Sequence, residues 1–416
     1  MTLDIADVGL VAAATRKPWL SPESYWPSTT VATAHHSAPV IALGMEALCA
    51  NAHDLLRRAG GLPIRVASKS IRVRAVLDAV LALPGFSGVL AYSLAEAVWL
   101  SDTIDDIVVA YPSVDRAAIA ALATDERVAE RVTIMVDSVD QLDVIDSVLP
   151  PTKRASIRVC LDFDASWQSG VLGHIGVLRS PIHNPRDLRE LAECVSQRPG
   201  FTVVGVMSYE AQIAGVGDKP VGKPATGLLM RAIQRMSGAE LRERRAEAIA
   251  SVREVAELEF VNGGGTGSIE STVAEGAVTE VAAGSGLYGP HLFDNYRQFT
   301  PAPAVAFALD VVRKPSANAA TLLGGGWIAS GPAGEDRLPQ LTWPTGLSYA
   351  PREAAGEVQT PVTGDAARDL RVGDRVWLRH TKSGEPMEHA DSVVPVIGGV
   401  ADDPVPTYRG EGKHFL

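Results

Sequence analysis

The stretch LPIRVASKSIRVRAVLDAVLALPGFSGVLAYSLAEAVWL, residues 62–100, contains two short apolar runs, each followed by a helical pattern. The runs are Ile64–Ser68 and Gly88–Tyr92, and amphipathic stretches over Ser70–Leu83 and Leu94–Leu100 follow them. Apolar residues at successive positions are typical of strands that are buried on both faces. Strand, helix and strand in this order predict a parallel pair of strands.

The same alternation continues to about residue 283. Further runs that we predict as strands are Asp106–Ala110, Val132–Val136, Ile157–Phe163, Phe201–Ser208, Leu258–Asn262 and Thr279–Ala283. About eight strands over some 220 residues predict an α/β fold, a (β/α)8 TIM barrel. A doubly wound open sheet is the alternative, but its glycine fingerprint follows the first strand. Here the glycine-rich turn follows the seventh run.

The character of the chain changes on both sides of the barrel. The run Pro39–Leu43 reads as one more strand, which we place outside the barrel. After about residue 290 helical periods stop, and short runs typical of strands appear at Ala304–Val312, Ala320–Leu323, Arg375–Arg379 and Val393–Ile397. We therefore expect a barrel domain over 35–290 and a C-terminal mostly-β domain over 291–416, with residues 1–34 joined to it.

Charge and composition exclude several classes of partner. The net charge of −11 opposes binding to nucleic acid, and no apolar run reaches the roughly 18 residues that span a bilayer. The N-terminus lacks the basic start of a signal peptide, and the three cysteines are far apart in the chain. We therefore expect a cytoplasmic protein with no nucleic-acid or membrane partner.

Lys69 directly follows the first strand of the predicted barrel. Active sites of such barrels lie at the C-terminal ends of the strands. We expect the Lys69 amine to have little contact with water there, which favours a nucleophile toward a carbonyl. The alternative is a lysine that reaches solvent or pairs with a carboxylate.

Glycine-rich turns follow the last two strands. VNGGGTGS, residues 261–268, precedes a helix start, and its backbone N–H groups together with the helix dipole favour a phosphate. Gly284-Ser285-Gly286 follows the eighth strand, and barrel phosphate sites commonly form in these two loops. The alternative is that these glycines serve only the geometry of tight turns. A lysine and a phosphate cup together predict a site for pyridoxal 5′-phosphate.

At these residues the chain resembles the fold-type III pyridoxal phosphate enzymes: alanine racemase and, more closely, the D-serine dehydratase and D-threonine aldolase group. APVIALGMEAL and LPIRVASKS, residues 38–48 and 62–70, resemble the segments around that group's cofactor lysine, which implies Lys69. GHIGVLRSP, residues 173–181, resembles the segment whose arginine contacts the cofactor ring, which implies Arg179. VNGGGTGS and TEVAAGSGLYGP resemble its phosphate-binding turns. The cofactor residues implied are Lys69, Arg179, Tyr209, Gly264, Gly265, Thr266, Gly267, Gly284, Ser285 and Tyr288.

The resemblance also implies a divalent metal (Zn, Mn or Mg) in the C-terminal domain, because the dehydratases and aldolases carry His-x-Cys or His-x-Asp after GDRVWLRH, residues 373–380. His380 is followed by Lys382, and an ammonium is not a metal ligand. His389 and Asp391 have the required spacing, so we expect the metal there.

The resemblance implies a lyase, an aldolase or a dehydratase, that acts through a Lys69 Schiff base on a D-amino acid with a β-hydroxyl, such as D-threonine or D-serine. It also implies a homodimer. One alternative is an amino acid racemase, whose second base could be His380, Tyr349 or Tyr408, and we retain His380 as a catalytic residue. The others are a non-catalytic pyridoxal phosphate carrier and a barrel enzyme that uses Lys69 without a cofactor. We expect the C-terminal PTYRGEGKHF, residues 406–415, to be a surface tail.

Overall fold

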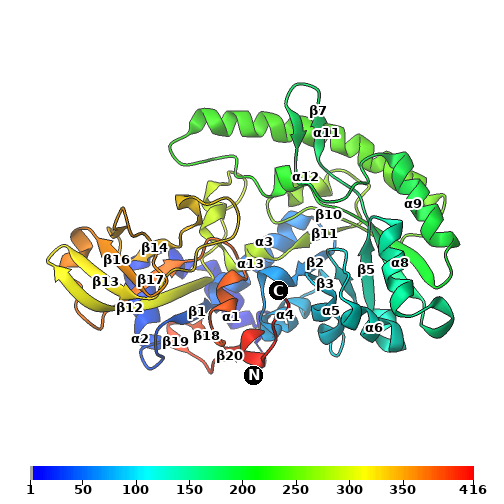
Figure 1. Cartoon of the computed structure of the whole chain (residues 1–416). Coiled ribbons are helices and arrows are strands. Elements are labelled where there is room, and N and C mark those ends of the chain that lie inside the picture. Colours follow the sequence, from blue (N-terminus) through cyan, green and yellow to red (C-terminus); the bar gives the residue numbers. More distant parts are fainter. Residues whose placement is uncertain (1–2) are drawn as a thin grey trace. The chain divides into compact units, whose positions relative to one another are not determined.

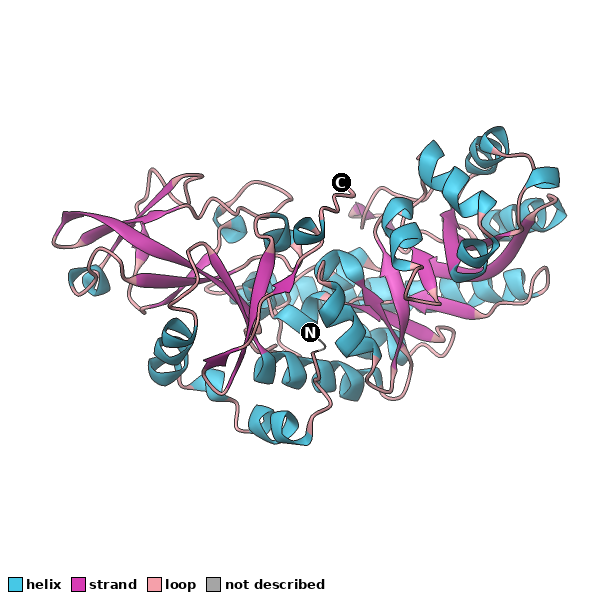
Figure 2. Cartoon of the chain, turned by 90° about the horizontal axis from the view of Figure 1, so that it is seen from below, coloured by secondary structure: helices cyan, strands magenta, loops and turns pink. Residues whose placement is uncertain are grey.

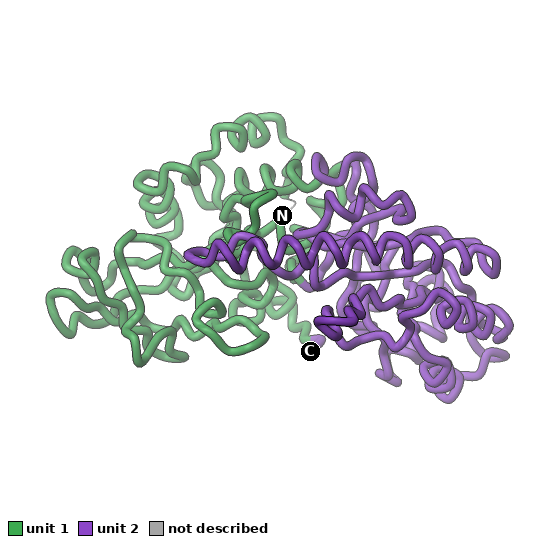
Figure 3. The backbone as a smooth tube through the Cα atoms, turned by 90° about the horizontal axis from the view of Figure 1, so that it is seen from above, with its two compact units in different colours: residues 1–55, 70–83, 284–414 green, residues 56–69, 84–283, 415–416 purple. Residues whose placement is uncertain are grey.

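The computed structural model describes residues 3–416, which form two compact units (Figure 3). One unit contains residues 56–69, 84–283 and 415–416. The other contains the N-terminal residues up to Leu55 together with 70–83 and 284–414. Neither unit is a continuous stretch, because residues 35–55 and 70–83 group with the C-terminal part rather than with the barrel.

Eight parallel strands close into a barrel within residues 56–283, as the sequence predicts. In chain order they are β2 (Ile64–Ala67), β3 (Phe86–Ala91), β4 (Ile107–Val109), β5 (Val132–Val136), β6 (Ile157–Asp162), β9 (Phe201–Ser208), β10 (Phe260–Gly263) and β11 (Glu280–Ala283). The last strand pairs with the first, with Val281 opposite Ile64. Because all strands run in the same direction, their C-terminal ends share one rim of the barrel.

Helices connect most of these strands (Figures 1 and 2). They are α5 (Leu94–Leu100), α6 (Arg116–Thr124), α7 (Glu126–Arg131), α8 (Val139–Val148), α9 (Pro185–Gln197), α10 (Ala211–Ala214), α11 (Pro224–Arg253) and α12 (Ile269–Val273). The side chains of Ser93, Asp115 and Ser138 accept backbone N–H bonds at the starts of α5, α6 and α8. Such caps satisfy donors that have no partner inside the helix and so define where each helix begins.

Two insertions were not predicted. A hairpin of β7 (Trp167–Ser169) and β8 (Gly173–Ile175) follows β6, and the 30-residue α11 lies between β9 and β10. Both expose large apolar side chains, among them Val171, Leu172 and Leu228. An apolar residue in these segments therefore does not mark a buried face, which is the signal on which a prediction from periodicity depends.

The second unit contains a mixed sheet. β1 (Val40–Gly44) pairs antiparallel with β12 (Val305–Ser316) and parallel with β18 (Ser392–Ile397), so this strand lies outside the barrel, as expected. The other strands are β13 (Ala319–Leu323), β14 (Gln340–Trp343), β15 (Ser348–Tyr349), β16 (Gln359–Thr363), β17 (Arg375–Arg379), β19 (Val400–Ala401) and β20 (Val405–Pro406). The predicted sheet-rich C-terminal part is confirmed.

Helices of the second unit come from distant parts of the chain. They are α1 (Val8–Thr15), α2 (Pro22–Ala32), α4 (Arg74–Leu81) and α13 (Ser285–Tyr288), and α3 (Met45–Ala59) runs from this unit into the other. Trp26 of α2 packs against Trp377 of β17, with 5.6 Å between their ring centroids. The Trp377 indole N–H donates to Thr30 Oγ1 at 2.8 Å. The N-terminal helices thus belong to the core of this unit.

A polar cluster in which Arg65 and Glu280 are buried lies near the starts of the barrel strands. The Arg65 guanidinium donates to Glu280 at 2.6 and 2.9 Å and to Asp106 at 2.9 Å. Asn262 Nδ2 donates to the same Glu280 carboxylate at 2.8 Å. The cluster joins β2 to β11, the pair of strands that closes the barrel.

None of the helices within residues 3–416 has the length and apolar character that a membrane span requires.

Candidate active site

Lys69 lies at the C-terminal rim of the barrel, in the turn that follows β2. Its Nζ donates to the Tyr111 hydroxyl at 3.3 Å, and Tyr111 follows β4 at the same rim. The Lys69 side chain is exposed, so the expectation that it would have little contact with water is wrong for this chain. A lysine on the rim is accessible to a ligand, whereas the interior of such a barrel is filled with packed side chains.

Arg179 extends between two tyrosine rings at this rim. Its guanidinium carbon lies 5.5 Å from the Tyr111 ring centroid and 5.7 Å from the centroid of Tyr209, which follows β9. Burial raises the pKa of the Tyr209 phenol to about 12, so this hydroxyl stays protonated and can donate a hydrogen bond. The structure thus brings Lys69, Arg179 and Tyr209 together around Tyr111, which the sequence analysis did not select.

A pocket beside these side chains carries two carboxylates. Its lining is Ala110, Tyr111, Asp162, Phe163, Asp164, Ala165, Val177, Arg179, Ser180, Met207 and Tyr209. Burial and the nearby Asp137 raise the pKa of Asp162 to about 7, although the Arg179 charge opposes this shift. Asp164 accepts from the Ser166 hydroxyl and lies 3.0 Å from His183 Nδ1. The pocket therefore offers a carboxyl that can change its charge near neutral pH, beside an arginine.

The glycine turn after β10 is held in a defined shape. Gly264 has φ of +77°, a region that favours glycine, and a Cβ there would lie 3.0 Å from Thr272 Oγ1. A Cβ on Gly265 would lie 3.0 Å from Tyr209 Cε2, so the turn passes close to that ring. The Gly265 N–H donates to Ser268 Oγ at 3.1 Å, and α12 begins directly after Ser268.

The rim residues fit pyridoxal phosphate in their chemistry. Lys69 could supply an amine for a cofactor aldehyde, and Arg179 and Tyr209 could supply donors for ring substituents. The Gly267 N–H has no acceptor among residues 3–416, which leaves it for a phosphate. Ser208, opposite Gly263, has a buried hydroxyl without a partner in the same range. Since β10, β11 and β2 are neighbours, the turn and Lys69 are two strand spacings apart, roughly 10 Å.

The remaining predicted cofactor residues belong to the other compact unit. Gly284 follows β11, and the Ser285 carbonyl accepts from Ser383 Oγ at 2.9 Å. Thr266 is the exception, because it belongs to the barrel unit, and its carbonyl accepts from Arg58 at 2.6 Å. Tyr288 is fully buried and donates to the Ile71 carbonyl at 3.1 Å, and burial raises its pKa. Their role toward a cofactor stays a prediction.

His380 is buried within its unit. Its Nδ1 lies 3.1 Å from the Val305 carbonyl oxygen and its Nε2 lies 3.3 Å from Ser383 Oγ. Burial, together with the charge of Arg379, lowers its pKa to about 3, so the ring is neutral at pH 7. Both ring nitrogens therefore face groups of the same unit. Nothing in these contacts favours its predicted catalytic role.

The predicted metal ligands do not fit a metal. The His389 ring stacks on Trp327 at 5.0 Å and 10°, and the Asp391 carboxylate accepts from Arg409 Nε at 3.1 Å. Within residues 3–416 no group of three or more His, Cys, Asp or Glu side chains could hold an ion. At the competing position, Lys382 Nζ donates to Ser330 Oγ at 3.2 Å.

The other two candidates for a second base are also engaged. The Tyr349 hydroxyl donates to the Pro339 carbonyl at 2.7 Å, and burial raises its pKa. Tyr408 is buried, and its N–H donates to the Arg72 carbonyl at 2.9 Å. The expectation of a loose surface tail is wrong, because Glu411 also pairs with Arg74 at 2.5 Å.

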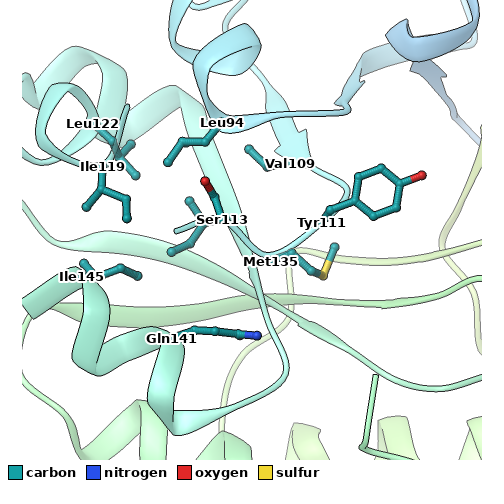
Figure 4. Close-up of a pocket in the computed structure, with 10 residues that line it drawn as sticks. Leu94, Val109, Tyr111, Ser113, Ile119, Leu122, Met135, Gln141 and Ile145 are labelled. Atoms are coloured by element: carbon teal, nitrogen blue, oxygen red, sulfur yellow. The ribbon is translucent and has the colours of Figure 1, made fainter. Parts of the chain in front are cut away.

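A second pocket lies under β4 and β5 and is almost entirely apolar (Figure 4). Its lining is Leu94, Val109, Tyr111, Ser113, Ile119, Leu122, Ile134, Met135, Gln141 and Ile145. In Figure 4 the Tyr111 hydroxyl points away from the aliphatic side chains. Tyr111 therefore forms part of the wall of both pockets and presents its polar end to Lys69.

No family model matches the sequence, and no curated protein matches it either. Solved structures do match. The D-threonine aldolase from Filomicrobium marinum has a TM-score of 0.72 at 19% identity, over 90% of this chain and 95% of that one. The D-threo-3-hydroxyaspartate dehydratase from Delftia sp. HT23 has a TM-score of 0.66 at 15% identity, over 89% and 97%.

Alanine racemase from Corynebacterium glutamicum is less similar, with a TM-score of 0.52 at 16% identity, over 81% of this chain and 88% of that one. At these identities the likeness concerns the fold. The resemblance that the lysine and glycine motifs predict is confirmed at that level: this chain has the barrel-and-sheet fold shared by D-threonine aldolase, D-threo-3-hydroxyaspartate dehydratase and alanine racemase.

Proposed function

We propose that this chain is a pyridoxal phosphate enzyme, a lyase that acts on a D-amino acid with a β-hydroxyl group. The observation that carries the proposal is the gathering of Lys69, Tyr111 and Arg179 on the rim that also bears the glycine turn. Likeness to a D-threonine aldolase and to a D-threo-3-hydroxyaspartate dehydratase favours a lyase over a racemase. By the same likeness we propose a homodimer.

Each residue of the site has a task in this proposal. Lys69 Nζ would hold the cofactor at its aldehyde, and the same amine could take a proton from the substrate Cα. The Tyr111 hydroxyl orients that amine, and Arg179 and Tyr209 orient the ring. When bound, pyridoxal phosphate supplies an electron sink for the bond that breaks at Cα. The pocket carboxyl of Asp162 lies beside this chemistry with a pKa of about 7.

The first test is the visible absorbance of the purified protein after addition of pyridoxal phosphate. We expect a band that borohydride abolishes in the wild type and that is absent in Lys69→Ala, because Lys69 contacts the same Tyr111 side chain as Arg179 on the rim. Lys153→Ala is the matched control. Lys153 is exposed and precedes β6, so it lies at the opposite end of the barrel strands from the rim. A wild type without a band refutes the cofactor, and activity without a band favours the cofactor-free alternative.

The second test identifies the reaction. D- and L-serine and D- and L-threonine are incubated with the holoenzyme, and ammonia, aldehyde and the opposite enantiomer are measured, with and without a chelator. We expect ammonia or aldehyde from the D-enantiomers, and a chelator-resistant rate because the predicted metal residues are engaged elsewhere. Interconversion of the enantiomers as the main reaction replaces the lyase with the racemase.

A further inference from the structure

Behind the glycine turn lies a carboxylate that no ligand could reach, Glu210. It is 1% exposed and follows Tyr209 in the chain. Its Oε2 accepts from the Gly264 N–H at 3.2 Å and from Arg245 Nη2 at 2.7 Å. Its Oε1 accepts from Ser268 Oγ at 2.9 Å and from the Thr272 hydroxyl. One side chain thus connects both ends of the turn to the first turn of α12.

Arg245 of α11 compensates the buried charge. It is fully buried, donates to the Ser208 carbonyl at 3.0 Å, and reaches Glu275 at 2.6 Å. Burial raises the pKa of Glu210, but Arg245 and the two hydroxyl donors outweigh this effect and hold the pKa below its ordinary value. Glu210 is therefore an anion at neutral pH, and a buried anion with four donors holds those donors in place.

The arrangement divides the polar groups of the turn into two sets. Gly264 N–H, Ser268 Oγ and Thr272 Oγ1 are directed to Glu210, and the N–H of Gly267 is not used by any described residue. A neutral side chain at position 210 would hold these three donors less strongly, and an absent one would release them, so the turn could relax.

We propose that Glu210, held by Arg245, is a positioning residue for the phosphate turn: it fixes residues 264–268 so that the unused Gly267 N–H can bind the cofactor phosphate. This inference rests on the proposed function, since it concerns the same cofactor. Glu210 acts through the turn and does not touch the ring or Lys69. Its contribution therefore concerns the phosphate group alone.

The experiment compares the dissociation constants of pyridoxal phosphate and of pyridoxal, which lacks the phosphate, by absorbance titration. In the wild type the phosphate tightens binding, and the ratio of the two constants measures that gain. We expect Glu210→Gln and Thr272→Val to reduce the ratio at least tenfold by weakening pyridoxal phosphate, with pyridoxal unchanged. Thr272→Ser keeps the hydroxyl and should keep the ratio.

Glu280→Gln is the matched control, because Glu280 is equally a buried carboxylate paired with an arginine but belongs to the opposite end of the barrel strands. It should lower stability and leave the ratio unchanged. If Glu210→Gln does not fold, the two Thr272 variants decide. The inference is overturned if the ratio survives in Thr272→Val, or if both ligands weaken equally. A wild type that binds neither ligand refutes the proposed function itself.

Discussion

Asp162 ends β6 beside Arg179, and its pKa of about 7 lies well above its usual 3.8. Desolvation is the largest cause, so the charged form is the one that the folded state disfavours. Between about pH 3.8 and about pH 7 the carboxyl would ionise in the unfolded chain but stays protonated in the folded one. The free energy of unfolding therefore falls as the pH rises through this range and changes no further above it. Asp162 therefore reduces stability at neutral and alkaline pH and has little effect in acid.

We accordingly expect Asp162→Asn to raise the free energy of unfolding at pH 8 by roughly 2–4 kcal/mol and to leave it nearly unchanged at pH 4. Urea unfolding at both pH values measures the difference. Asp365→Asn, at an almost fully exposed position, is the control and should change neither value. An equal effect of Asp162→Asn at the two pH values contradicts the assigned pKa.

The sequence could indicate some of the site residues but not others. Lys69 and Arg179 could be selected because a familiar motif surrounds each of them. Tyr111 could not, since a tyrosine after a strand is common and its contact with Lys69 depends on β2 and β4 lying on one rim. Glu210 and Arg245 resemble ordinary surface charges in the sequence, and only the fold reveals that they are buried together.

Among the elements, the strands were the most predictable. The predicted bounds of Val132–Val136 and Phe201–Ser208 agree with β5 and β9, because these strands are buried along almost their whole length. The helix α11 was not predicted, since Leu228, Leu229 and Met236 are exposed and give no consistent apolar face. Hydrophobic periodicity identifies an element only where the apolar residues are also the buried ones.

The joint between β2 and β11 depends on the buried ion pair of Arg65 and Glu280. Arg65→Met leaves Glu280 buried without its arginine, and we expect a loss of about 3–5 kcal/mol in the free energy of unfolding. The double variant Arg65→Met with Glu280→Met removes both charges and should lose less than the single variant. Denaturant unfolding of the two proteins checks this order, and a double variant less stable than Arg65→Met would refute it.

For the whole molecule, the sequence predicted a barrel and a sheet-rich part, and both are present. It did not predict how the chain is shared between them. Residues 70–83 look like an ordinary barrel helix in the sequence, yet they group with the second unit, as do residues 35–55. Local patterns specify elements, whereas the grouping of elements depends on contacts between residues far apart in the chain.

The place of β1 in its sheet also bears on how the protein is made. Val40–Gly44 is apolar and fully buried, but its partners are β12, which begins at residue 305, and β18, which ends at residue 397. At about 5–20 residues per second, a ribosome needs on the order of 20–70 seconds to reach β18 after β1. Until β12 is made this strand has neither neighbour, and until β18 is made it still lacks one of them, so nascent chains of this protein should bind chaperones that recognise short apolar segments.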